Sequence, residues 1–251
     1  MTGVAGAAIA VQGLRKHYGK VEAVRNVSFE VARGTTMALL GGNGAGKTTT
    51  LSMLLGVLTP TAGTITVLGC DMLTRRYDVL PRMNFTSPYV DLPKRLTVRE
   101  NLLVFADLYG VANADDRIAE LAAEFDLGGL LKRPYGQLSA GQRTRVSVAK
   151  ALINRPEVLL LDEPTASLDP DTADWVRARL ERYRDAHGAT MLIASHNMAE
   201  VERLCERVIF MKRGKIEDDD TPARLLARYG RETLEEVFLD VARGRAREVA
   251  P

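Results

Sequence analysis

Eight residues near the start of the chain, GGNGAGKT at 41–48, have the composition and spacing of a phosphate-binding loop. They fit the pattern G-x-x-x-x-G-K-[ST] and stand between a predicted strand at 35–40 and a predicted helix at 47–58. Backbone N–H groups of such a loop point inward to phosphate oxygens, and the helix N-terminus adds a partial positive charge. The predicted nucleotide-binding residues are Gly41, Gly42, Asn43, Gly44, Ala45, Gly46, Lys47, Thr48 and Thr49.

Acidic residues that could act beside this loop occur in VLLLDEP at 158–164. Lys47 is expected to reach the β- and γ-phosphates, and the Thr48 hydroxyl to ligate Mg²⁺. A strand that ends in Asp162 can present its carboxylate to the same metal. Glu163 points elsewhere in an extended chain and is placed to polarise an attacking water. Taken alone, the acidic pair could equally cap the following turn; beside a phosphate loop, catalysis is the favoured interpretation.

A second predicted anion site begins at QLSAGQ, residues 137–142. Ser139 and Gly141 open a predicted helix through RTRVSVAKALINR, whose first amides are free to bind an anion. An ordinary serine-capped helix is the alternative. With the phosphate loop and VLLLDEP in the same order, the sequence resembles the ATP-binding cassette (ABC) ATPases, whose LSGGQ signature stands here as LSAGQ, with Ala140 at the third position.

This resemblance implies a dimer that closes on ATP. In the family two subunits pair head to tail, so that Ser139, Gly141 and Gln142 of one subunit would face the γ-phosphate held by the other. SLD at 167–169 resembles the family's D-loop, which places Asp169 at the dimer contact.

Two further positions match the family. His196 follows the predicted strand 189–195 and matches the switch histidine that reads the γ-phosphate, so Glu163, His196 and Lys47 form the expected catalytic set. Tyr18 resembles the aromatic residue that stacks on adenine, although an aromatic in a hairpin can equally just pack. The resemblance extends from about Ile9 to Lys215.

The segment NFTSPYVDLP at 84–93 departs from the family, which keeps a glutamine there that approaches Mg²⁺ and the attacking water. The equivalent position is Ser87, or Pro88 if the loop differs by one residue, and no glutamine occurs from 83 to 100. Serine is shorter by about 2 to 3 Å, so its contact with the metal requires a loop shift or a bridging water. Slower or re-tuned hydrolysis is the expectation.

The same segment suggests a partner. Tyr89, Val90 and Leu92, between Pro88 and Pro93, place apolar groups on a connector that is expected to be exposed, and exposed apolar patches mark protein contacts. The resemblance implies a groove for a coupling helix of a membrane permease; the alternative is that these side chains pack under the neighbouring helices. No apolar run is long enough to span a membrane, so the permease is expected to be a separate chain.

The amino-acid composition limits which other classes of protein the chain can belong to. Hydrophobic content of 46% with 26% charge is typical of a soluble globular protein. Two distant cysteines argue against a disulfide framework or zinc site and favour a cytoplasmic setting, here on the inner face of the membrane. A net charge of +2 is too small to imply nucleic-acid binding.

The order of elements predicts an α/β fold of the P-loop NTPase type, with a mainly parallel sheet, an N-terminal antiparallel β subdomain and an inserted helical subdomain at about 89–150. The ABC ATPase domain is expected at 1–220, and a short helical tail at 221–251. The acidic run EDDD at 217–220 is interpreted as a solvated loop. The tail resembles ATPases of ABC-2 type exporters; alternatively, its apolar residues Leu234, Val237, Phe238 and Val241 simply pack back on the domain.

The predicted function is therefore the ATP-hydrolysing motor subunit of an ABC transporter, more consistent with export, which uses ATP and Mg²⁺ and works as a dimer, expected to be a homodimer. Two alternatives stay open at this point. One is a soluble ABC ATPase that acts on ribosomes or DNA, and the other is a regulatory subunit that binds ATP with little hydrolysis.

Overall fold

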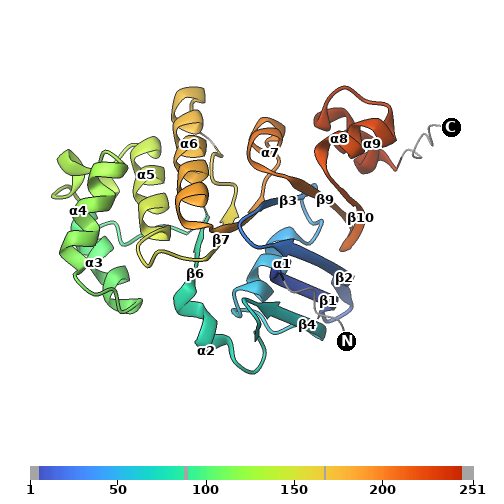
Figure 1. The fold of residues 1–251 in the computed structure, drawn as a ribbon, viewed down its shortest axis with the longest axis horizontal. Helices are drawn as coiled ribbons and strands as arrows, with labels where there is room; N and C mark the ends of the chain where they lie inside the picture. The colour runs from blue at the N-terminus through green and yellow to red at the C-terminus, as the bar shows by residue number, and fades with distance from the viewer. Residues whose placement is uncertain (1–5, 88–89, 167, 245–251) are drawn as a thin grey trace.

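The computed structural model describes residues 6–87, 90–166 and 168–244, and its strands form two sheets (Figure 1). The first has the order β2-β1-β4-β5 and consists of β1 Ala7–Tyr18, β2 Val21–Ala32, β4 Ala62–Val67 and β5 Cys70–Asp71. The second has the order β10-β9-β3-β8-β7-β6 and consists of β3 Thr36–Leu40, β6 Met83–Thr86, β7 Val158–Asp162, β8 Thr190–Ala194, β9 Arg207–Lys212 and β10 Lys215–Asp220. The first sheet is antiparallel, and the second is parallel except for β10. The predicted α/β class is confirmed.

The parallel strands are apolar throughout because both faces of their sheet are covered. Every residue of β3 is buried, and successive side chains point to opposite faces. Ala38 and Leu40 pack with the helices of one core, whereas Met37 and Leu39 join a second core that is shared with the antiparallel sheet. Packing on both faces of the parallel sheet therefore holds the ends of its strands in place.

Three helices of the middle segment gather at one end of the molecule, at the left of Figure 1, where an inserted helical subdomain was expected. These are α3 Val98–Leu108, α4 Ala114–Glu124 and α5 Ala140–Ala151. Thr97 and Glu100 form a capping box that starts α3. The other helical elements are α1 Lys47–Leu54, α2 Arg76–Val79, α6 Pro170–His187, α7 Met198–Leu204, α8 Pro222–Tyr229, α9 Leu234–Arg243 and the 3₁₀ turns Leu80–Arg82, Gly128–Leu130 and Tyr135–Gln137.

The helix after the phosphate loop is shorter than the apolar pattern indicates. It ends at Leu54 instead of residue 58, because Gly56 adopts a left-handed φ of 68° that a helix cannot contain. The spacing of apolar residues alone does not reveal where this helix ends.

The acidic run at 217–220 is not a solvated loop, so that interpretation is wrong. It belongs to β10, which pairs antiparallel with β9, and Asp218 and Asp220 are buried. Arg228 of α8 forms ion pairs with both carboxylates. The tail is held on the domain by these pairs and by the buried side chains Leu234, Val237 and Val241, as in the packing interpretation.

Replacing Arg228 by leucine is expected to destabilise the protein by roughly 3 kcal/mol, because the buried carboxylates of Asp218 and Asp220 lose the guanidinium group that pairs with both. The matched control is Arg224→Leu on the same helix, because Arg224 is exposed and lies 3.6 Å from Asp220; its expected cost is under about 1 kcal/mol. Urea unfolding of both variants measures the difference. Equal costs would show that the buried pairs do not anchor the tail.

Candidate active site

The predicted site residues follow the carboxyl ends of neighbouring parallel strands. In the order β3-β8-β7-β6, these ends lead into the loop 41–46, His196, Asp162 with Glu163, and Ser87. Because parallel strands present their carboxyl ends at one edge of a sheet, residues far apart in the sequence meet there, and ligands of open α/β sheets bind at this edge.

Neighbouring backbone crowds the loop after β3 so closely that two of its positions require glycine. A Cβ atom at Gly41 would lie 2.5 Å from the Met211 carbonyl oxygen, and one at Gly46 would lie 2.8 Å from the Ala23 carbonyl oxygen. Gly46 also has a φ of 107°. Between them, the amides of Asn43 and Gly44 find no acceptor among the described residues. Together with the first turn of α1, they offer N–H groups to an anion.

Lys47 begins α1 and folds back over the loop, where its ammonium group donates to the Gly41 carbonyl. Burial lowers the pKa of Lys47, while the negative charges of Glu163 and Asp162 act in the opposite direction. The lysine therefore lies within electrostatic reach of both carboxylates. Thr48 is exposed beside it, and its hydroxyl is available to a ligand.

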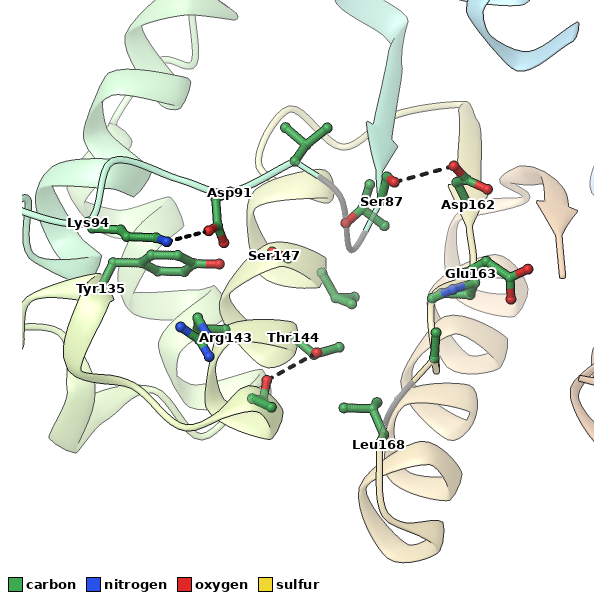
Figure 2. A pocket seen from close by; sticks show the side chains of 16 residues that line it. Ser87, Asp91, Lys94, Tyr135, Arg143, Thr144, Ser147, Asp162, Glu163 and Leu168 are labelled. Atoms are coloured by element: carbon green, nitrogen blue, oxygen red, sulfur yellow. Dashed lines mark hydrogen bonds and ion pairs between the residues drawn. The ribbon is translucent and has the colours of Figure 1, made fainter. Parts of the chain in front are cut away.

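Asp162 ends β7 in a buried position. Burial raises the pKa of its carboxyl, and a hydrogen bond from the Ser87 hydroxyl at 3.3 Å opposes this shift (Figure 2). Ser87 is itself buried at the end of β6. The residue in place of the expected glutamine thus contacts the carboxylate that was predicted to bind the metal.

Glu163 and His196 form a pair. The His196 Nδ1 atom lies 2.6 Å from Glu163 Oε1; the imidazole is 69% exposed, whereas the carboxylate is only 11% exposed. Glu163 is not extended as predicted, because its φ is 51°. This left-handed turn lets its N–H donate to the Ala194 carbonyl at the end of β8, which directs the carboxylate toward His196.

A cavity of about 420 Å³ lies between these strand ends and α5. Figure 2 shows Asp162 and Glu163 on one side of the cavity and Arg143 and Thr144 of α5 on the other. Ser147, one turn further along α5, also lines it. None of these three α5 residues is among the predicted site residues. Their i, i+1, i+4 spacing after the signature places them on one helix face, which is the signal that could have found them.

The signature residues lie apart from the phosphate loop of the same chain. Ser139 caps α5 by accepting from the Gln142 amide, and the Gln142 side chain accepts from the Ser139 amide. Within the described ranges, no hydrogen bond joins Ser139, Gly141 or Gln142 to residues 41–49. Figure 1 shows α5 and α1 on opposite sides of α6.

Tyr18 and Asp169 are accessible, as their predicted roles require. Tyr18 ends β1 and is 50% exposed. Asp169 caps α6 by accepting from the Thr172 amide, a bond that lowers the pKa of its carboxyl. Ser167 of the same motif lies outside the described residues.

The predicted apolar connector is exposed only in part. Val90 is 56% exposed, but Leu92 is 3% exposed and belongs to the helical core. The expectation that Leu92 faces a partner is therefore wrong, because α3 and its neighbours cover it. Pro88 and Tyr89 lie outside the described residues.

The comparisons with known proteins decide the family. A family model described as "ABC transporter" matches residues 24–166. The chain belongs to the ABC transporter family. Among its relatives is the Nod factor export ATP-binding protein I of Paraburkholderia xenovorans (strain LB400), with 40% identity over 223 residues, which cover 88% of this chain and 73% of that protein.

Solved structures agree with this membership. The structure of an ATP binding subunit of an ABC transporter has a TM-score of 0.85 at 26% identity and covers 93% of this chain and 99% of its own. The dimeric structure of a bacterial ABC transporter cassette has a TM-score of 0.77 at 26% identity, with coverage of 85% and 98%.

As an ABC transporter ATPase, the chain is an ATP-binding and ATP-hydrolysing motor subunit that dimerises. No helix in the described part of the chain is long and apolar enough to cross a bilayer.

Proposed function

We propose that Glu163 is the residue that activates water for ATP hydrolysis and that His196 orients it. The observation that carries this proposal is the 2.6 Å contact between His196 Nδ1 and Glu163 Oε1, beside Asp162 and within electrostatic reach of Lys47. A mostly buried carboxylate that is held in one orientation can accept a proton from water, and the exposed imidazole can contact the γ-phosphate.

Phosphate and metal are held by a different set of residues. Lys47 and the amides of residues 42–48 bind the phosphates. Thr48, Asp162 and Ser87 offer only oxygen donors, and Asp162 is a buried carboxylate whose pKa is raised by burial, so the set fits a hard cation such as Mg²⁺. When bound, Mg²⁺ would neutralise phosphate charge during transfer. The shorter reach of Ser87 is expected to slow hydrolysis, which stays a prediction.

The nucleotide site is completed by a second copy of the chain. Ser139, Gly141 and Gln142 of one subunit face the γ-phosphate that is bound to the other, and Asp169 lies at the contact. Tyr18 stacks on adenine. The exposed helix start of α5 and the exposed Tyr18 and Asp169 support this arrangement.

Transport requires a partner in the membrane, and we propose a separately encoded permease with export as the direction. The name of the Paraburkholderia relative supports export. Exposed Val90 lies beside Ser87 in the same cavity lining, and Val104 and Leu108 of α3 and Tyr77 of α2 are further exposed apolar side chains available for a partner. The subunit then lies on the cytoplasmic face of the membrane. In this scheme residues 1–220 form the motor domain, with helices at about 89–150 inserted, and 221–251 form the tail.

Mixing two inactive variants tests the shared site. Lys47→Ala removes the phosphate ligand, and Gly141→Asp places a negative charge in the signature. In a head-to-tail dimer, each mixed pair has one site free of both substitutions. An equimolar mixture is therefore expected to recover up to about a quarter of wild-type Mg-ATPase activity.

Each variant alone at the same total concentration is the control for that mixture. Activity of the mixture equal to the mean of the two variants would contradict the trans arrangement, because a site contained within one chain cannot be complemented.

A further inference from the structure

The outer edge of β6 is bound by side chains from the α5 end of the helical segment. β6 is the edge strand of its sheet, and among the strands of the described residues it pairs only with β7. On the side of β6 that faces away from β7, the Met83 and Phe85 carbonyls have no strand to bond to. A buried carbonyl without a hydrogen bond costs folding free energy. Lys150 Nζ donates to the Phe85 carbonyl oxygen at 2.6 Å, and Asn154 Nδ2 donates to the Met83 carbonyl oxygen at 3.0 Å. We call Lys150 and Asn154 the β6 clamp.

Further contacts of the β6 clamp fix its geometry. Asn154 also donates to the Pro81 carbonyl at 2.8 Å and accepts from Asn84 Nδ2 at 2.7 Å. The Lys150 ammonium lies 5.2 Å from the centre of the Phe105 ring of α3, a cation–π contact. Burial lowers the pKa of Lys150 to about 8, so the charged form still dominates at pH 7. A buried charge of this kind is kept in place by strong directional bonds.

The clamp lies between two parts of the ATPase. Two residues beyond Phe85, the hydroxyl of Ser87 reaches Asp162 at 3.3 Å. At the other end of α5, eleven residues from Lys150 or about 17 Å away, Ser139 caps the signature helix. Glutamine, whose longer side chain would reach the metal from this loop, is replaced by a shorter residue. The clamp joins α5 to the strand that leads directly into Ser87.

We propose that Lys150 and Asn154 are positioning residues that couple the signature helix α5 to the metal site by holding Ser87 against Asp162. This inference rests on the proposed role of Asp162. A movement of α5 when the partner's nucleotide engages Ser139 would be transmitted through the clamp to the end of β6 and would change the contact between Ser87 and Asp162. Conversely, breaking the clamp leaves α5 and Ser87 able to move independently.

The test measures kcat and KM for Mg-ATP on the full chain carrying Lys150→Met, Ser87→Ala or both. Each single change is expected to lower kcat about tenfold, the effect of losing one hydrogen bond that involves a charged group, with KM changed less than about twofold. Because Lys150 acts through Ser87, the double variant is also expected to lose about tenfold, not the product of the two losses. Lys150→Arg, which keeps a charged donor, is expected to retain most of the turnover.

Three results would overturn the inference: wild-type kcat in Lys150→Met, wild-type kcat in Ser87→Ala, or losses that multiply in the double variant. Asn154→Ala answers the same question if Lys150→Met melts below the assay temperature, and wild-type kcat there would also refute the coupling. Lys132→Met, at an exposed lysine of the helical segment, is the control. Absence of Mg-ATP turnover from the wild type and this control would instead overturn the proposed function, and the inference with it.

Discussion

Glu163→Gln is expected to lower kcat for ATP hydrolysis by about a thousandfold while ATP affinity changes little. Glutamine has the same shape as glutamate and still offers an oxygen to His196, but it cannot accept a proton from water. The phosphate loop and Lys47 are unchanged, so ATP still binds. The variant should therefore accumulate as an ATP-bound dimer, which size-exclusion chromatography with ATP detects.

Glu30→Gln is the matched control, because Glu30 is an exposed residue of the antiparallel sheet. It is expected to keep wild-type turnover. Loss of a general base should lower kcat by more than about tenfold. If Glu163→Gln kept more than about a tenth of wild-type kcat, another group would have to activate the water, and the Glu163–His196 pair would be structural.

Lys47→Ala is expected to act at an earlier step by weakening ATP binding and lowering kcat/KM by at least about a hundredfold. The lysine supplies the positive charge at the phosphates, and its partly buried position strengthens that attraction. Isothermal titration with ATP separates this variant from Glu163→Gln, which should bind ATP normally.

Lys132→Ala controls for the loss of a surface charge and is expected to behave as the wild type. Normal ATP affinity in Lys47→Ala would mean that backbone amides alone hold the phosphates. The lysine would then serve chiefly to order the loop through its bond to the Gly41 carbonyl.

The sequence by itself was enough to predict the candidate site because the motifs that form it are contiguous. A loop such as 41–48 binds phosphate through its own backbone, so spacing and glycine content suffice to predict it. The apolar run 158–161 and the strand-like run 189–195 likewise predict buried strands, and polar residues directly after such a run lie at the sheet edge. For this reason Asp162 and Glu163 could be named in advance, whereas the role of His196 came from the resemblance to the ABC ATPases.

Only the tertiary structure decided which polar groups are buried and what they contact. Leu92 and the acidic residues of β10 are covered by the helices that follow them in the chain, and the N–H of Glu163 bonds to Ala194 of another strand. The bond from Lys150 to the Phe85 carbonyl spans 65 residues. A local sequence pattern indicates which secondary structure a segment prefers. Which polar side chains become buried, and which groups they pair with, depends on surfaces that meet only after folding. The motif residues could therefore be predicted from the sequence, but the contacts that connect α5 to Ser87 through Lys150 could not.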